Sequence, residues 1–237
     1  DIHMRSQITF NNSFWINSKC REQDSKERIV AIIGSGRFAF STIAFFLFKH
    51  NKKFLRCVFS PGKSKAVSLC KYFNGLYVPS DWRDILNDEK IKLVYIASPP
   101  ETHAEYAVAC IKAGKNVYIE KPPVTSESQL KLLYESIIDN PESKVFLGFN
   151  RSSAETFIEL NNFVSSESGF MKANCYMSVN KSRVTSNFKD IDFAILNHIC
   201  HFTDLFLRLI TLERAFPCTI MPKEITVDKS KLRFSFS

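Results

Sequence analysis

The segment 93–123, with the sequence LVYIASPPETHAEYAVACIKAGKNVYIEKPP, limits most strongly what this chain can fold into. An apolar run at 93–97 ends at Ser-Pro-Pro, a periodic segment at 102–113 ends at Gly114, and a second apolar run at 117–119 ends at Glu-Lys-Pro. Continuous aliphatic runs are typical of parallel strands that are buried on both faces. The segment therefore predicts a strand, a helix and a second strand, which together make one crossover unit of a parallel sheet.

The lysine at the end of the second apolar run is a candidate for ligand binding. Ligands of open parallel sheets bind at the carboxyl ends of the strands, and Lys121 stands at such an end, between Glu120 and Pro122. There it can present a fixed ammonium group to a ligand above the sheet. The alternative interpretation is an ordinary solvated lysine after a strand.

A dinucleotide-binding fingerprint lies nearer the amino end. Residues 28–33 predict a strand and residues 39–48 a helix. The turn between them reads Gly34, Ser35, Gly36, Arg37, Phe38 and Ala39. In such a turn the first glycine permits the tight bend, the second lets the backbone approach a pyrophosphate, and the third small residue allows close helix-to-strand packing. Free N–H groups and the positive end of the helix dipole face the phosphates, so this part of the chain predicts a nucleotide-binding α/β domain with a doubly wound parallel sheet.

Four segments together resemble the glucose-fructose oxidoreductase, inositol dehydrogenase and rhizopine catabolism family, called Gfo/Idh/MocA. They are AIIGSGRFA at 31–39, IASPPETHAEYAVACIKAGKNVYIEKP at 96–122, GFNR at 148–151 and HICHFTDL at 198–205. The resemblance implies an NAD(P)-dependent oxidoreductase. It also implies an amino-terminal Rossmann domain and a carboxyl-terminal α/β (α+β) domain with an open, mainly antiparallel sheet.

On this basis we expect three parts. Residues 1–27 form an amino-terminal extension, in part possible tag sequence, residues 28–149 the NAD(P)-binding Rossmann domain, and residues 150–237 a shortened substrate and oligomerisation domain. In the family the segment after the last Rossmann strand runs beside the nicotinamide, so Asn150 and Arg151 are expected to touch cofactor or substrate. A bare linker is the alternative.

The expected cofactor contacts come from the loops that follow the strands. In chain order they are Gly34, Ser35, Gly36, Arg37, Phe38, Ala39, Ser60, Lys63, Ala97, Ser98, Pro99, His103, Glu120, Lys121 and Arg151.

Cofactor preference depends on the end of the second predicted strand, 54–59. NAD-preferring folds usually place an acid there to bind the ribose hydroxyls, whereas this chain has Ser60 followed by Pro-Gly and Lys63. Ser60 can donate a hydrogen bond to a 2′-phosphate and Lys63 can supply charge, which favours NADP over NAD. The alternative is a solvated turn that does not discriminate between the two.

A polar stripe on the apolar segment 193–212 is the second site candidate. Read as a helix, the segment places Asn197, His201, Asp204 and Arg208 on one face. The family pattern has a histidine here, three residues before an aspartate and commonly four after another acid, whose place Asn197 takes. A buried structural histidine is the alternative.

The resemblance implies that Lys121 and His201 work together, with Asn197 orienting substrate or imidazole. Removing a hydroxyl proton while a hydride leaves the same carbon needs an acid/base group that titrates near neutrality, which His201 supplies. Lys121 stabilises the developing charge on the oxygen. We expect hydride transfer between nicotinamide and a hydroxyl or carbonyl carbon of a sugar, cyclitol or nucleotide sugar. The alternatives are a non-catalytic NAD(P)-binding regulatory or assembly protein, and reduction of a carbon–nitrogen double bond.

Composition argues against several other classes. The net charge of +8 is scattered and comes with no nucleic-acid motif. The seven cysteines form no CxxC pair, which indicates buried thiols rather than disulfides or a zinc site, and no metal is expected. No window is apolar enough to span a membrane or act as a signal peptide. A cytoplasmic protein is therefore expected.

The carboxyl end predicts a hairpin. Apolar residues alternate before and after a turn at 228–231 and leave an apolar-faced edge strand. We expect either a truncated chain or a partner that covers this edge, with a homo-oligomer formed through the carboxyl-terminal sheet.

Overall fold

The computed structural model describes residues 28–166, 176–180, 200–205, 207–209, 222–228 and 231–236. The chain divides into two compact units, Asp1–Gly148 and Phe149–Ser237. Each unit is considered by itself below.

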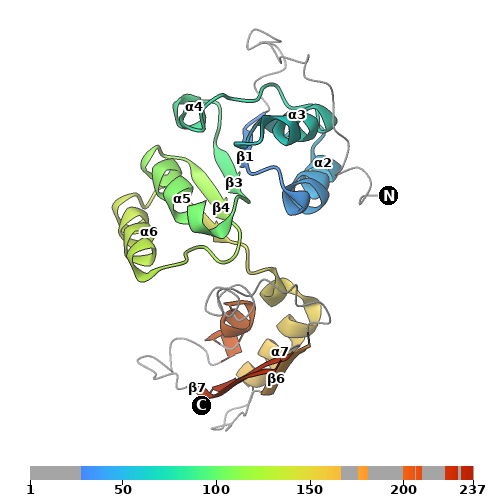
Figure 1. The fold of residues 1–237 in the computed structure, drawn as a ribbon, viewed down its shortest axis with the longest axis vertical. Helices are drawn as coiled ribbons and strands as arrows, with labels where there is room; N and C mark the ends of the chain where they lie inside the picture. The colour runs from blue at the N-terminus through green and yellow to red at the C-terminus, as the bar shows by residue number, and fades with distance from the viewer. Residues whose placement is uncertain are drawn as a thin grey trace. The chain divides into compact units, whose positions relative to one another are not determined.

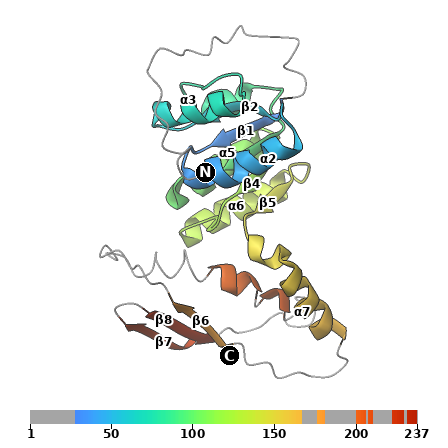
Figure 2. The ribbon, with the colours of Figure 1, turned by 90° about the vertical axis from the view of Figure 1, so that its right-hand side faces the viewer.

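Unit 1 is built on a five-stranded parallel sheet with the order β2-β1-β3-β4-β5 (Figures 1 and 2). The strands are β1 (Val30–Ile33), β2 (Leu55–Phe59), β3 (Leu93–Ile96), β4 (Asn116–Ile119) and β5 (Val145–Leu147). The chain builds outward from β1 to β2 and then returns to place β3 on the other side of β1. This reversal is the switch point at which doubly wound sheets bind their ligands. The predicted Rossmann-like parallel sheet is confirmed.

Helices connect the strands, as expected for parallel neighbours. They are a wide-turn helix η2 (Ala39–Ala44) continued by α2 (Phe45–His50), then α3 (Lys63–Tyr72), α4 (Arg83–Asn87), the 3₁₀ turn η3 (Pro100–Thr102), α5 (His103–Lys112) and α6 (Glu127–Asp139). The ends of α5 and α6 follow local rules. The Ser126 hydroxyl caps α6 by accepting from the N–H of Gln129, and α5 stops before Gly114, whose φ is +69°.

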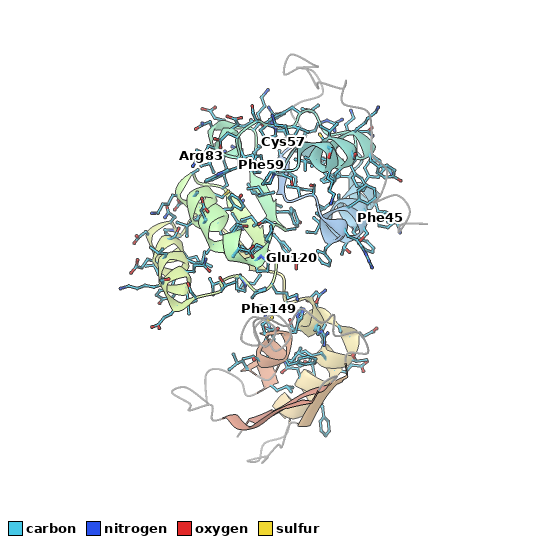
Figure 3. All side chains as sticks on the ribbon, in the orientation of Figure 1. Phe45, Cys57, Phe59, Arg83, Glu120 and Phe149 are labelled. Atoms are coloured by element: carbon cyan, nitrogen blue, oxygen red, sulfur yellow. The ribbon has the colours of Figure 1, made fainter. Side chains whose placement is uncertain are left out.

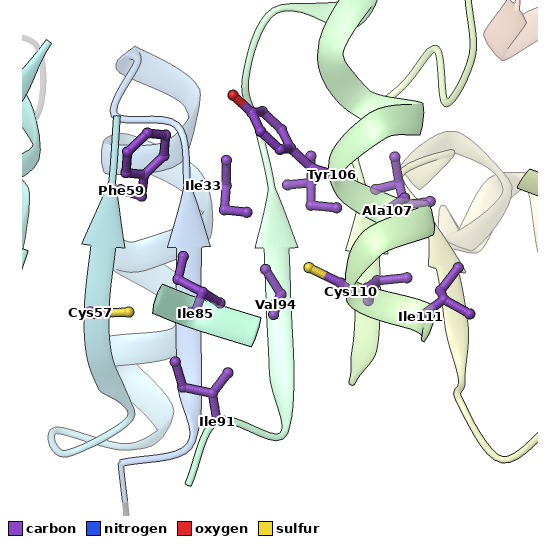
Figure 4. Packing of buried hydrophobic residues seen from close by; sticks show 14 of the residues in the cluster. Ile33, Cys57, Phe59, Ile85, Ile91, Val94, Tyr106, Ala107, Cys110 and Ile111 are labelled. Atoms are coloured by element: carbon purple, nitrogen blue, oxygen red, sulfur yellow. The ribbon is translucent and has the colours of Figure 1, made fainter. Parts of the chain in front are cut away.

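Alternate residues of β1 fill two separate cores. Val30 and Ile32 pack with α2 and α3 on one face of the sheet, whereas Ala31 and Ile33 pack with α4 and α5 on the other. Figure 4 shows the second core, where Cys110 of α5 points toward Val94 of β3. Burial of both faces explains why these strands read as unbroken aliphatic runs.

A remnant of a further strand lies outside β2. Tyr77 forms a single parallel bridge with Cys57, and the N–H of Leu76 donates to the carbonyl of Arg56 at 2.8 Å. Two residues on, Pro79 has no N–H to donate to a ladder. The pairing therefore ends after one bridge.

Unit 2 contains η4 (Asn150–Ser153), α7 (Glu155–Ser166) and a three-stranded sheet. Strands β6 (Tyr176–Asn180), β7 (Pro222–Asp228) and β8 (Lys231–Phe236) pair antiparallel in the order β6-β8-β7. The alternating residues at the carboxyl end thus pair as a hairpin, with Ile225 opposite Phe234. Residues 200–205 and 207–209 are helical, and the rest of the predicted helix 193–212 lies outside the described residues.

Two further observations concern the described residues alone. None of their helices combines the length and apolarity needed to cross a bilayer, and they contain no cluster of three or more metal-binding side chains. Their cysteines, Cys57, Cys70, Cys110 and Cys200, are free. Burial raises the pKa of the Cys70 and Cys110 thiols to about 12, so these thiols are unreactive at neutral pH.

Candidate functional site

Gly34 forms the turn after β1 and fits against the loop after β3. Its φ is +110°, and a Cβ added to it would lie 2.3 Å from the carbonyl oxygen of Ala97 and 2.8 Å from the nitrogen of Ser98. Its own N–H donates to the carbonyl of Phe59 at 2.8 Å. Gly34 therefore lets the loops that follow β1 and β3 touch at the switch point.

Gly36 is unlike Gly34, because the protein itself does not explain it. A Cβ added there would meet no protein atom within 4 Å, and its φ lies outside the positive range. The carbonyl of Gly36 accepts the N–H of Phe40 at 3.1 Å as the helix begins. Space over an exposed glycine at the amino end of a helix is the arrangement that lets a diphosphate approach the backbone.

The other fingerprint residues divide between solvent and core. Ala39 is fully buried in the core beneath α2, which is the close packing expected of the third small residue. Arg37 and Phe38 are exposed and Ser35 is half-buried. These three are accessible to a ligand, and their contacts with a cofactor stay a prediction.

The residues predicted to choose between NAD and NADP lie where β2 ends. Ser60 is half-buried directly after the strand, and Lys63 is the exposed first residue of α3. Both therefore stand at the same edge of the sheet as Gly34.

The loop after β3 continues the sheet for one more residue. The N–H of Ala97 donates to the carbonyl of Ile33 at 2.8 Å, which holds the half-buried Ala97 and Ser98 beside the glycine turn, while Pro99 is exposed. The Thr102 hydroxyl donates to the Ser98 hydroxyl at 2.8 Å.

Glu120 and Lys121 follow β4, with Glu120 labelled in Figure 3. The N–H of Glu120 donates to the carbonyl of Ile96 at 2.9 Å. Its buried carboxylate accepts from the Tyr118 hydroxyl at 3.0 Å and from the N–H of Lys121 at 3.3 Å. Burial raises the pKa of this carboxyl above its ordinary value. Lys121 is half-buried, and its peptide bond to Pro122 is cis.

His103 lies inside the protein. Its side chain is 1% exposed, with Nδ1 2.8 Å from the carbonyl oxygen of Pro122 and Nε2 2.8 Å from that of Ser98. Both ring nitrogens thus face main-chain oxygens, and a direct contact with a cofactor stays a prediction.

Unit 2 holds the remaining candidates. The His201 ring lies edge-on to that of Phe149, with centroids 6.1 Å apart, and the Arg151 guanidinium lies 4.5 Å from the centre of the Phe202 ring. Asn197 lies outside the described residues.

Part of the predicted polar stripe is present on the described helical residues. Arg208 donates through Nε to Asp204 Oδ1 at 3.0 Å, as expected for side chains four residues apart on one face. The roles predicted for His201 and Asn197 stay predictions.

The sequence analysis did not identify Tyr118 as a site residue. Its hydroxyl holds the Glu120 carboxylate, and its ring lies 4.9 Å from that of Tyr95 in the neighbouring strand. A usable signal existed, since residues two apart at the end of a strand point to the same face. The Tyr-x-Glu spacing therefore predicts that contact.

The first unit fits a dinucleotide. The glycine turn packs against the β3 loop without a Cβ, the space over Gly36 contains no protein atom within 4 Å of a Cβ, and Lys121 follows a neighbouring strand at the same edge. Because parallel strands end at one edge, these groups belong to one ligand-binding rim.

Comparison with known proteins agrees with this geometry. A model of the Gfo/Idh/MocA family, described as an oxidoreductase family with an NAD-binding Rossmann fold, matches residues 28–149. Inositol 2-dehydrogenase of Salmonella paratyphi B is 30% identical over 110 residues, which cover 46% of this chain and 32% of that enzyme.

Two solved structures share the fold. Myo-inositol 2-dehydrogenase from Lactobacillus plantarum has a TM-score of 0.67 at 19% identity, over 78% of this chain and 56% of that one. GenD2 from gentamicin A biosynthesis, in complex with NAD, has a TM-score of 0.66 at 20% identity, over 83% of this chain and 56% of that one. The matches thus span about a third of the curated relative (32%) and just over half of the solved structures (56%). By its match to the family over residues 28–149, the chain belongs to the Gfo/Idh/MocA family of oxidoreductases with an NAD-binding Rossmann fold.

Proposed function

We propose that this protein is an NAD(P)-dependent oxidoreductase that transfers a hydride between the nicotinamide and a hydroxyl or carbonyl carbon of a sugar, cyclitol or nucleotide sugar. One observation supports this above the others. The loops after β1, β3 and β4 meet at one edge of the sheet, where Gly34 touches the Ala97 carbonyl and Lys121 follows a strand in register with β3.

The first unit would hold the nucleotide through its main chain. The diphosphate lies over Gly36, where free N–H groups at the start of the helix donate to it. Ser35, Arg37 and the β3 loop residues Ala97 and Ser98 border this space. When bound, the nicotinamide supplies the hydride acceptor or donor.

Lys121 would act on the substrate oxygen. Its ammonium donates a hydrogen bond to that oxygen and stabilises the negative charge that develops as the hydroxyl proton leaves. A group fixed before reaction gains more than one that must reorganise. The Lys121 main chain is fixed in this way, because its N–H is bonded to the Glu120 carboxylate and the N–H of Glu120 to β3.

His201 would exchange the proton. A neutral imidazole nitrogen accepts the hydroxyl proton during oxidation and returns it during reduction. The His201 ring is partly exposed, so it can exchange that proton with solvent. Asn197, as an amide, orients substrate or imidazole and carries no proton.

NADP is favoured over NAD in this proposal. Ser60 and Lys63 stand where β2 ends, at the place where an acid would otherwise bind the ribose hydroxyls. An exposed ion pair contributes about 1 kcal/mol at most, so Lys63→Ala should weaken NADPH about fivefold and leave NADH unchanged. Lys65→Ala, on the same exposed helix turn, is the matched control.

The substrate class comes from the relatives, among which inositol dehydrogenases occur. The self-association expected through the carboxyl-terminal sheet is a further part of the proposal. Sedimentation equilibrium of the chain measures it directly, and a monomer at micromolar concentration would contradict it.

Nucleotide binding and turnover test the proposal. Fluorescence titration with NADPH and NADH measures binding. A panel of cyclitols, sugars and nucleotide sugars, each mixed with the oxidised nucleotide, then tests turnover through the appearance of the reduced nicotinamide.

Lys121→Ala and His201→Ala should each lower turnover about 10²-fold or more, the usual contribution of an acid/base or charge-stabilising group. Lys112→Ala and His50→Ala change an exposed lysine and an exposed histidine and serve as matched controls that should retain activity. Binding without turnover on any substrate would favour the regulatory alternative, whereas absence of binding to both nucleotides would refute the proposal.

A further inference from the structure

His103 joins the two loops on which the proposed site depends. It is the first residue of α5, and its imidazole is almost fully enclosed at 1% exposure. Nε2 lies 2.8 Å from the Ser98 carbonyl in the loop after β3, and Nδ1 lies 2.8 Å from the Pro122 carbonyl in the loop after β4. One rigid ring therefore spans both loops.

The chemistry of the two partners determines what the ring must do. A carbonyl oxygen only accepts hydrogen bonds, whereas a neutral imidazole has one donor nitrogen and one acceptor nitrogen. Two contacts of 2.8 Å to carbonyls are both satisfied only when each ring nitrogen carries a proton. A buried acceptor facing a lone pair would cost the desolvation of both groups.

Each of the two carbonyls belongs to a segment with a role in the proposed site. Ser98 is next to the Ala97 carbonyl that meets Gly34, so its position sets the wall of the glycine turn. Pro122 directly follows Lys121. Lys121 thus lies between two fixed points, the sheet hydrogen bond of Glu120 to Ile96 on one side and the bond of Pro122 to His103 on the other.

We infer that His103 is a positioning residue, which donates from both ring nitrogens to hold the glycine-turn wall and the lysine loop at a fixed separation. The inference rests on the proposed function for the roles of the two loops. It assigns to His103 the alignment of Lys121 with the nucleotide, not contact with the nucleotide or the substrate.

Two single-donor variants separate the two bonds. An asparagine amide nitrogen stands close to the place of Nδ1 and a glutamine amide nitrogen close to that of Nε2, so His103→Asn keeps the Pro122 bond and His103→Gln keeps the Ser98 bond. His103→Asn should weaken nucleotide binding about 10-fold with kcat nearly unchanged. His103→Gln should bind nucleotide normally and lose about 10- to 100-fold in kcat, the size expected for a misplaced catalytic group.

Gln129 provides the matched control, because it links the same two segments farther out. Its amide donates to the Glu101 carbonyl at 3.0 Å and its oxygen accepts from the N–H of Thr125 at 2.7 Å. Gln129→Ala removes that link and should leave both affinity and kcat within about twofold of wild type, a change of less than 0.5 kcal/mol. Equal losses in the Gln129 and His103 variants would overturn the inference, since any loop tie would then be equivalent.

A spectrum of the ring tests the inference without turnover. In ¹⁵N-labelled wild type at neutral pH, both His103 ring N–H groups should give signals protected from solvent exchange, and His103→Leu assigns them by their loss. A single ring N–H would overturn the double donation whether or not the protein binds nucleotide. Two protected signals in a protein that binds no nucleotide would support the bridge between the loops and refute only the proposed function.

Discussion

Gly34→Ala is the substitution whose cost follows most directly from the structure. At φ +110° the residue lies outside the small left-handed region that side chains tolerate, a strain of about 1–3 kcal/mol. The added Cβ would also lie 2.3 Å from the Ala97 oxygen and 2.5 Å from its carbon. These are backbone atoms, which cannot rotate away, so overpacking adds about 1–3 kcal/mol.

The two contributions together lower the free energy of unfolding by about 2–6 kcal/mol. With a urea m-value of about 2 kcal/mol/M, the denaturation midpoint moves down by about 1–3 M. Circular dichroism at increasing urea measures the midpoint, and the slope should stay the same, since the surface exposed on unfolding does not change.

Gly36→Ala is the matched control two residues away. No protein atom lies within 4 Å of its Cβ position, so the unfolding free energy should change by less than about 0.5 kcal/mol. Its affinity for nucleotide should nonetheless fall about 10-fold or more, because the methyl group occupies the approach of the diphosphate. A Gly34→Ala protein with the wild-type midpoint would refute the packing argument, and a Gly36→Ala protein with wild-type affinity would refute the placement of the diphosphate.

Three further substitutions or measurements test the packing and the buried groups. Ile96→Ala, at a fully buried residue of β3, should cost about 2–5 kcal/mol in urea unfolding, whereas Ile138→Ala, 60% exposed on α6, should cost less than about 0.5 kcal/mol. Burial raises the pKa of Glu120 above 4.5, so the folded protein holds this proton longer than the unfolded chain and its stability falls as pH rises through the raised pKa. Wild type should therefore lose stability relative to Glu120→Gln between pH 4.5 and neutrality, and a difference that is flat with pH would contradict the assignment. Because the pKa of Cys110 is raised to about 12 by burial, iodoacetamide should not label Cys110 at pH 8 until denaturant is added, as peptide mass spectrometry would show.

The strands of unit 1 were predictable because both of their faces are buried. Unbroken aliphatic runs mark β1, β3 and β4, and only their ends differ from prediction. The strand expected at 145–149 ends at Leu147, and the next unit begins at Phe149. An apolar run continues through such a boundary because burial, not pairing, is what it reports.

Hydrogen bonds that depend on tertiary contacts were not predictable in the same way. The rule that ligands bind at strand ends was enough to select Gly34, Lys121 and the loop after β3. No spacing rule links His103 to the Ser98 and Pro122 carbonyls, since these bonds join segments that only the sheet brings together.

The ladder hydrogen bonds do not stop where the strands end. Gly34 donates to Phe59 at 2.8 Å, Ala97 to Ile33 at 2.8 Å and Glu120 to Ile96 at 2.9 Å, so each loop at the carboxyl edge takes its first position from the neighbouring strand. Geometry held this way depends on core packing beneath it. A core variant such as Ile96→Ala should therefore weaken nucleotide binding even while the protein remains folded, because the carbonyl of Ile96 holds the chain that carries Lys121. A variant that loses several kcal/mol of stability yet binds nucleotide as wild type does would show that the edge loops hold their positions without the sheet.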